Sequence, residues 1–121
     1  MRVAVIGSRS VTEDAYAALC EKMPIGASEI ISGGAAGADT LAARYAEEAG
    51  LPLTVLRPDY AAYGRRAPLE RTDRILARAD YVLALWDGAS RGTAYAINAC
   101  IRTYKPVRVI LIKGEHHATT S

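Results

Sequence analysis

The feature that most constrains the fold is a short apolar run that breaks into glycines and restarts as an amphipathic helix. The segment Glu29–Ile31 suits a short buried strand, and three glycines interrupt the chain within Gly33–Gly37. One face of the following helix is apolar, with Ala38, Leu41, Ala42, Tyr45, Ala46 and Ala49 at helical spacing. Gly50, with a proline two residues later, ends this helix. The stretch therefore predicts a strand, a glycine loop and a helix in succession.

The glycine loop is the first candidate for a binding site. Gly33, Gly34 and Gly37 are expected to allow positive φ angles and a close approach of a ligand to the backbone. The N-terminus of the following helix adds unpaired N–H groups and a partial positive charge, which together favour a phosphate. A tight turn that binds nothing has the same glycines, so the loop alone leaves both interpretations open.

Apolar runs and helical patterns alternate along the whole chain. The expected strands are Arg2–Ile6, Glu29–Ile31, Leu53–Leu56, Tyr81–Trp86 and Val107–Ile112. The alternation predicts an α/β fold, a Rossmann-like, three-layer, doubly wound sheet of five mainly parallel strands in the order 3-2-1-4-5. At 121 residues the chain fits a single such domain at residues 1–113, followed by a polar C-terminal tail at residues 114–121.

The helical patterns also predict which side chains face the core. Inward-facing residues are expected at Tyr16, Leu19, Cys20 and Met23, then at Leu69, Thr72, Leu76 and Ala79, and finally at Ile97, Cys100, Ile101 and Tyr104. Thr12 is the expected N-cap of the first of these helices. Outward-facing residues of the second are expected at Glu70, Arg71, Asp73 and Arg74. The segment Asp59–Arg66 lacks periodicity and is predicted to be a long loop, a kind of segment that often carries function.

The predicted fold brings three loops together. In a parallel sheet of this order, the switch point lies between the first and fourth strands, where ligands of such folds bind. The loops Gly7–Ser10, Ser32–Asp39 and Asp87–Thr93 follow strands one, two and four. We therefore expect them to meet at the carboxyl edge of the sheet and to form one crevice from three helix N-termini.

Composition narrows the class of protein only a little. The 15 Lys and Arg residues nearly balance the 13 Asp and Glu residues, so net charge argues neither for nor against nucleic acid. The N-terminal apolar run is too short for a signal peptide, and no run approaches the roughly 20 apolar residues of a membrane span. Cys20 and Cys100 fall on expected apolar helix faces, so both are predicted to be reduced and buried. We therefore expect a cytoplasmic protein that does not bind a membrane.

The motifs of common cofactor sites are absent. The dinucleotide fingerprint GxGxxG is only approximated within Ser32–Gly37, and Arg57 stands where an NAD enzyme has an acidic residue. The sequence has no GxxxxGK[ST] motif of a P-loop NTPase. His116 and His117 lie in the predicted tail, where a zinc site is not expected. We therefore expect neither a cofactor nor a metal.

Hydroxyl and guanidinium groups in the three loops fit phosphate binding better than nucleophilic catalysis. The hydroxyls are those of Ser8, Ser32, Ser90 and Thr93. No histidine lies near them in sequence to activate a nucleophile, so we interpret them as donors to a phosphate. Arg9 and Arg91 are placed to add charge-assisted hydrogen bonds to the same anion, although both also suit a solvated surface.

An ordered series of short motifs runs from about Val3 to Ile112. The motifs are Gly7-Ser8-Arg9, Ser32-Gly33-Gly34-Ala35-Ala36-Gly37-Ala38-Asp39-Thr40-Leu41-Ala42, Tyr63-Gly64-Arg65-Arg66-Ala67 with Arg71 and Ile75, Ala79-Asp80, Trp86-Asp87-Gly88-Ala89-Ser90-Arg91-Gly92-Thr93 and Lys105-Pro106-Val107. The series resembles the YspA-type branch of the SLOG superfamily, which unites the DNA-processing protein DprA with the LOG cytokinin-activating phosphoribohydrolases. The resemblance implies a Rossmann-like fold with a nucleotide-type ligand at the three loops. It also implies a role in sensing or processing nucleotide derivatives such as ADP-ribose-like molecules.

The sequence departs from this resemblance at two positions. The LOG enzymes carry a PGGxGTxxE motif whose glutamate serves N-glycosidic cleavage, and Ala96 stands at that position here. Thr72 replaces the asparagine that usually follows the arginine at position 71 in this branch. Cleavage of a ribosyl bond favours a nearby carboxylate, and Asp39 and Asp87 are the acids within the crevice loops. Each also suits a structural role, as a charge in the first helical turn or as a turn former.

The leading expectation is binding of a phosphorylated nucleoside or nucleotide derivative, ADP-ribose-like or similar, by a sensor or processing protein. The expected ligand-binding residues are Gly7, Ser8, Arg9, Ser32, Gly33, Gly34, Ala35, Gly37, Asp39, Tyr63, Arg71, Asp87, Gly88, Ser90, Gly92 and Thr93. Tyr60 and Tyr63 would close over a base or ribose. We also expect the chain to form a homo-oligomer, a dimer or higher.

Two other functions remain open from the sequence. One is hydrolysis of an N-glycosidic or phosphoribosyl bond, with Asp39 or Asp87 as the acid or base. The other is DprA-like binding of single-stranded DNA, with Tyr60 and Tyr63 stacking on bases. The basic stripe for the second would comprise Arg57, Arg65, Arg66, Arg71 and Arg74.

Overall fold

Five parallel strands form one sheet in the order β3-β2-β1-β4-β5. The strands are β1 (Arg2–Gly7), β2 (Glu29–Ser32), β3 (Leu53–Val55), β4 (Tyr81–Trp86) and β5 (Val107–Leu111). This arrangement confirms the predicted Rossmann-like fold and its strand order. The structure, a computed structural model, describes residues 1–34 and 36–112, so the predicted tail lies outside the described residues.

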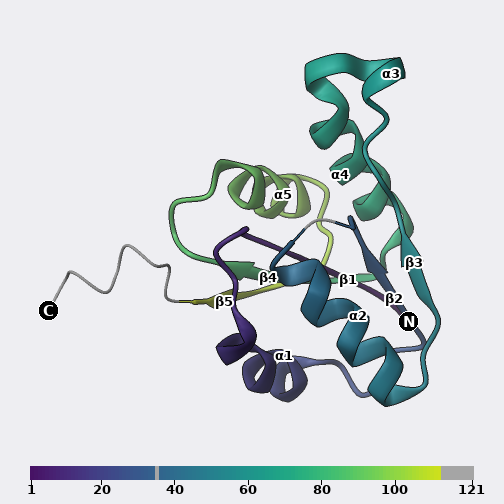
Figure 1. Ribbon diagram of the computed structural model, residues 1–121, viewed down its shortest axis with the longest axis vertical. Helices are drawn as coiled ribbons and strands as arrows, with labels where there is room; N and C mark the ends of the chain where they lie inside the picture. The colour runs from purple at the N-terminus through teal and green to yellow at the C-terminus, as the bar shows by residue number, and fades with distance from the viewer. Residues whose placement is uncertain (35, 113–121) are drawn as a thin grey trace, which may run out of the picture.

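Helices cover both faces of the sheet (Figure 1). The helices α1 (Tyr16–Lys22) and α2 (Ala38–Ala49) lie on one face, and α4 (Ala67–Arg78) and α5 (Arg91–Arg102) lie on the other. The short turns η1 (Glu13–Ala15), α3 (Tyr60–Tyr63) and η2 (Gly64–Arg66) precede α1 and α4. No helix within residues 1–34 and 36–112 is long and apolar enough to cross a membrane.

The core has two apolar layers, one on each face of the sheet. On the face of α1 and α2, Val5 and Leu85 pack with Leu19 and Leu41. On the other face, Ala4, Ile31 and Val82 pack with Ile75, Leu76 and Cys100. Each fully buried aliphatic side chain contributes about 1.5–3 kcal/mol, so these layers fix the central strands firmly. The central pair β1 and β4 stays in register up to Gly7 and Leu85, where their loops leave the sheet side by side.

Several predicted core positions are exposed. The prediction for Cys20 is wrong, because the buried face of α1 runs through Tyr16, Leu19 and Met23 and leaves this thiol at its border. The prediction for Ile101 is also wrong, because α5 buries Thr93, Ala96, Ile97 and Cys100, and Ile101 points away from that face with 63% of its surface exposed.

Tyr104 and Ala49 are exposed because each lies where its helix stops contacting the sheet. Tyr104 follows the end of α5 in a left-handed conformation, with φ of 57°, and is 94% exposed. The N–H of Lys105 closes this helix end by donating to the carbonyl oxygen of Cys100 at 2.8 Å. Ala49 is the last residue of α2 and is exposed, and Gly50 then ends the helix as predicted, with φ of 69°.

The segment Asp59–Arg66 is not the predicted loop. It forms the single turn α3 followed by the 3₁₀ turn η2, and it continues into α4. The carboxylate of Asp59 caps α3 by accepting a hydrogen bond from the N–H of Ala62 at 3.0 Å. A helix of one turn is too short to produce an apolar periodicity, which explains why the sequence pattern did not indicate it.

Candidate functional site

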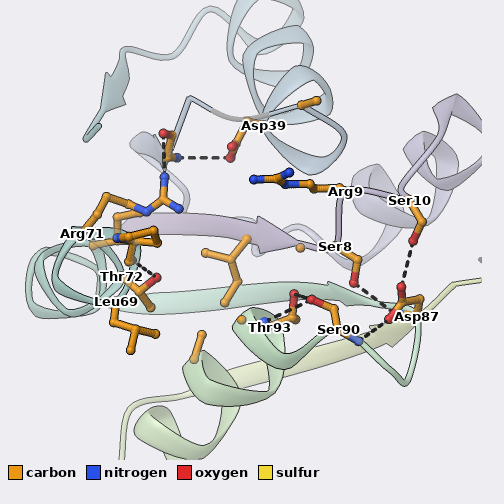
Figure 2. Close-up of a pocket in the computed structure, with 18 residues that line it drawn as sticks. Ser8, Arg9, Ser10, Asp39, Leu69, Arg71, Thr72, Asp87, Ser90 and Thr93 are labelled. Atoms are coloured by element: carbon orange, nitrogen blue, oxygen red, sulfur yellow. Dashed lines mark hydrogen bonds between the residues drawn. The ribbon is translucent and has the colours of Figure 1, made fainter. Parts of the chain in front are cut away.

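Three loops and the start of α4 surround a cleft of about 510 Å³ at the carboxyl ends of the central strands (Figure 2). The loops are those that follow β1, β2 and β4, and they meet as the sequence predicts. The lining residues are Ile6, Gly7, Ser8, Arg9, Ser10, Gly33, Ala36, Asp39, Pro68, Leu69, Arg71, Thr72, Ile75, Asp87, Ser90, Gly92, Thr93 and Ala96. The cleft is therefore the candidate site.

The carboxylate of Asp87 organises the loop between β4 and α5. It accepts hydrogen bonds from the N–H groups of Ala89 (2.9 Å) and Ser90 (2.8 Å) and from Ser10 Oγ (2.9 Å). Burial alone would raise the pKa of Asp87, but these hydrogen bonds outweigh it and lower the pKa to about 2. Asp87 is therefore ionised at neutral pH and has no proton to donate, which favours its structural role over general acid catalysis.

Ser8 connects the loop after β1 to the loop between β4 and α5. Its hydroxyl accepts a hydrogen bond from the N–H of Asp87 at 3.3 Å, and its own N–H donates to the carbonyl oxygen of Leu85 at 3.0 Å. Only 2% of Ser8 is exposed. Ser8 and Ser10 therefore join the loops after β1 and β4 into one wall of the cleft.

Two helices of twelve residues begin at the cleft. At the start of α5, Ser90 is the N-cap, and its hydroxyl accepts from the N–H of Thr93 at 3.5 Å. At the start of α2, the N-cap is Gly37, which has no side chain to cap the helix. The first N–H groups of a helix have no acceptor within it, and they give this end a partial positive charge. Both ends therefore offer backbone donors that suit an anion.

Gly33 closes the loop after β2 through two hydrogen bonds. Its N–H donates to Asp39 Oδ1 at 3.1 Å, and its carbonyl oxygen accepts from Arg71 Nη1 at 2.8 Å (Figure 2). The prediction of a positive φ holds for Gly34 and Gly37 but not for Gly33. Gly33 instead leaves room for the guanidinium of Arg71. A Cβ at position 33 would collide with Arg71 Nη1 and lie 2.8 Å from Arg71 Cζ.

Arg71 points into the cleft, so the prediction that it faces outward on α4 is wrong. The first two turns of α4 line the cleft through Pro68, Leu69, Arg71 and Thr72, and the side chain of Arg71 reaches the loop after β2. Arg71 Nε is buried and has no hydrogen-bond acceptor among the described residues. A guanidinium therefore borders the cleft with an unsatisfied donor.

Arg9 brings a second guanidinium to the cleft, from the loop after β1. Its side chain extends over the cleft on the side of Asp39 and Arg71 (Figure 2). Within residues 1–34 and 36–112, Arg9 is exposed and makes no hydrogen bond or ion pair. It is therefore free to contact an anion.

The sequence prediction missed an apolar wall of the cleft. Pro68, Leu69 and Ile75 of α4 form it together with Ile6 and Ala96. Leu69 is 38% exposed, so its predicted inward orientation is wrong. The sequence signal for this wall was the helical spacing of positions 68, 72 and 75, which places them on one face of α4. Ala96 lies in the cleft itself, so the position of the LOG-type glutamate carries only a methyl group here.

The cleft contains most of the predicted ligand-binding residues. Those that line it are Gly7, Ser8, Arg9, Gly33, Asp39, Arg71, Asp87, Ser90, Gly92 and Thr93. Those that do not are Ser32, which is 1% exposed, and Gly34, Gly37, Tyr63, Gly88 and Arg91. Ala35 lies outside the described residues.

Comparisons with known proteins agree with the fold. The fold matches the solved structure of DNA processing protein A from Helicobacter pylori, described for its unique single-stranded DNA binding mode, with a TM-score of 0.67 and 22% sequence identity. The match covers 98% of this chain and 70% of that chain, and at this identity it shows the fold alone. No curated protein matches the sequence. A family model matches residues 1–63, and the chain accordingly belongs to the YspA, cpYpsA-related SLOG family.

Proposed function

We propose that the cleft binds a phosphorylated nucleoside or nucleotide derivative. The observation that carries the proposal is the convergence of two twelve-residue helix N-termini and the unpaired Arg9 at one cleft. Backbone N–H groups at helix N-termini bind phosphate well, and a guanidinium adds charge-assisted hydrogen bonds. The phosphate of the ligand would therefore lie between α2, α5 and Arg9.

The remaining walls fit the rest of such a ligand. A volume of about 510 Å³ lies within the range of small-molecule sites. Pro68 and Leu69 offer an apolar surface for a base. The hydroxyl of Thr72 donates to the carbonyl oxygen of Pro68 at 3.0 Å, and its oxygen can still accept a hydrogen bond from a ribose hydroxyl. The mixture of an apolar wall and polar loops suits a nucleoside better than a bare phosphate.

Isothermal titration calorimetry with the 5′-monophosphates of the four common ribonucleosides tests the proposal. Arg9→Ala should weaken binding about tenfold, the value of one charge-assisted hydrogen bond. Arg108→Ala is the matched control, because it removes an exposed arginine from β5, away from the cleft. If neither the monophosphates nor the corresponding 5′-diphosphates bind, or if the two variants weaken binding equally, the proposal fails.

Binding of single-stranded DNA is the second candidate. Four exposed residues favour it, because Tyr60, Tyr63, Arg65 and Arg66 lie together on α3 and η2, and aromatic rings with arginines suit stacked bases. Arg74 of the predicted stripe is less available, since its Nε contacts Glu70 at 2.8 Å and its Nη2 donates to the carbonyl oxygen of Arg57.

A titration with fluorescent oligothymidylate at two salt concentrations separates this candidate from the first. DNA binding by exposed arginines should weaken steeply as salt rises. The double variant Tyr60→Ala with Tyr63→Ala should lower the affinity for DNA and leave nucleoside monophosphate binding unchanged. Affinity for DNA that is insensitive to both salt and this variant would exclude the surface formed by α3 and η2.

A further inference from the structure

A second pocket of about 350 Å³ adjoins the cleft beside α3. It shares Arg9, Gly33, Pro68 and Arg71 with the cleft. The residues that line only this pocket are Gly34, Arg57, Pro58 and Tyr60. We call it the arginine pocket, and a ligand in the cleft can extend into it past Arg71.

The charges of the two spaces differ. The arginine pocket is lined by three guanidiniums, those of Arg9, Arg57 and Arg71, and by no carboxylate among the described residues. The cleft has two arginines, and Asp39 and Asp87 balance their charge. None of the three arginines forms an ion pair within residues 1–34 and 36–112. The positive potential is therefore strongest in the arginine pocket, and it favours a group of higher negative charge.

Two adjacent glycines hold two of these guanidiniums in place. Arg71 Nη1 donates to the carbonyl oxygen of Gly33 at 2.8 Å, and Arg57 Nη1 donates to that of Gly34 at 3.3 Å. A Cβ at Gly34 would lie 2.6 Å from Arg57 Nη1, and the φ of 76° at this position favours a glycine. Each guanidinium has five N–H donors, and one bond to a carbonyl leaves the others for a ligand.

The surroundings fix Arg57 further. Arg74 Nη2 donates to the carbonyl oxygen of Arg57 at 2.8 Å, and Arg74 is itself held by Glu70. Arg71 Nε is buried without an acceptor among the described residues, which is a costly state for a charged group and one that an anion beside it would relieve. Tyr60 stands at the rim with 59% of its surface exposed. Its ring is available to a group that continues beyond the anion.

We propose that the arginine pocket receives a second phosphoryl group of the ligand. The inference rests on the proposed function, in which the cleft holds a nucleoside and its first phosphate. The ligand class is then the nucleoside 5′-diphosphates and their esters, with any substituent on the outer phosphate packing on Tyr60. Arg57 is the residue that distinguishes a diphosphate from a monophosphate, because it lines the arginine pocket and not the cleft.

Calorimetry with matched 5′-mono- and diphosphates of adenosine, guanosine, cytidine and uridine tests this inference. The wild type should bind the best diphosphate about tenfold or more tighter than its monophosphate. Arg57→Ala should remove this preference and leave the affinity for the monophosphate within about twofold. Arg57→Lys should restore part of the preference, because it keeps the charge but not the planar fork. Arg108→Ala, which removes an exposed arginine of β5 that lines neither space, is the control and should change neither affinity.

The outcomes separate the two proposals. If monophosphates and diphosphates bind equally tightly to the wild type, the second subsite is wrong and the proposed function stands. The second subsite is also wrong, and the proposed function stands, if Arg57→Ala lowers the affinities for monophosphate and diphosphate by the same factor. If no nucleotide of either kind binds, the proposed function and the second subsite fail together.

Discussion

The guanidinium of Arg71 and the carbonyl oxygen of Gly33 are joined at 2.8 Å, although 38 residues separate them in the sequence. This hydrogen bond holds the start of α4 against the loop after β2, at the boundary between the cleft and the arginine pocket. Gly33 permits it by leaving the space that a Cβ would occupy.

We predict that alanine costs less stability at Gly33 than at the adjacent Gly34. Gly33→Ala displaces the flexible end of Arg71, so it should change the free energy of unfolding by less than about 1 kcal/mol while weakening ligand binding. Gly34→Ala should destabilise the protein by about 1–2 kcal/mol, because Gly34 has φ of 76° and a side chain there is strained. Urea unfolding and calorimetry on both variants measure these effects. A larger loss of stability in Gly33→Ala than in Gly34→Ala would contradict this account.

We predict that Asp87→Asn destabilises the protein in a pH-dependent way. The pKa of Asp87 is about 2 in the folded chain and near 3.8 ordinarily, so its charge stabilises the fold above about pH 4. This contribution, at most about 2 kcal/mol, disappears as the pH falls through the interval between the two values. The stabilities of wild type and variant in urea unfolding should therefore differ most at pH 7, differ by about half as much near pH 3, and converge toward pH 2. A difference that stays constant with pH would argue against the role of the charge.

We predict that Tyr16→Phe lowers the free energy of unfolding by about 1 kcal/mol. Tyr16 is 8% exposed, its hydroxyl donates to Glu48 Oε1 at 2.6 Å, and burial together with this hydrogen bond raises the pKa of its phenol. Tyr95→Phe is the matched control, because the hydroxyl of Tyr95 donates to Asp73 at 2.9 Å in an exposed contact. Thermal unfolding should show the larger loss for Tyr16→Phe. Equal losses of stability in the two variants would mean that burial does not strengthen the hydrogen bond between Tyr16 and Glu48.

The two cysteines should react at very different rates. Cys20 is exposed, whereas Cys100 is buried, and burial raises the pKa of its thiol. Ellman's reagent should therefore modify one thiol of the native protein quickly and the second only after unfolding. Cys20→Ser should abolish the fast phase. A fast phase that survives this substitution would place the accessible thiol at Cys100.

The elements that the sequence predicted best are those whose environment is uniform along their length. The run Tyr81–Trp86 is apolar throughout, as a parallel strand covered on both faces requires, and β4 has the same bounds. The end of α2 at Gly50 was predicted equally well, because a left-handed cap depends on local residues only. Strands that alternate with helices allow only a few sheet topologies, because the crossover connections are right-handed, so the strand order could be predicted too.

The candidate site was predictable in its loops but not in the wall formed by α4. The sequence places charged residues such as Arg71 on the solvated side of an amphipathic helix. The true direction of Arg71 depends on the contact between α4 and the loop after β2, which is a property of the packed chain. Leu69 was misjudged for the same reason, since a side chain that lines an open cleft is apolar without being in the core.

The hydrogen bond between Ser10 and Asp87 spans 77 residues, and that between Gly33 and Arg71 spans 38. Residues 1–63, which the family model matches, contain two of the three loops, whereas the opposite wall comes from positions 68–96. Contacts of such long range form late, since closing large loops of chain is costly in entropy. A chain still emerging from the ribosome therefore has no cleft until β4 and the start of α5 are in place. Ligand binding therefore requires that β1, β2, β4 and the first turns of α5 have already assembled.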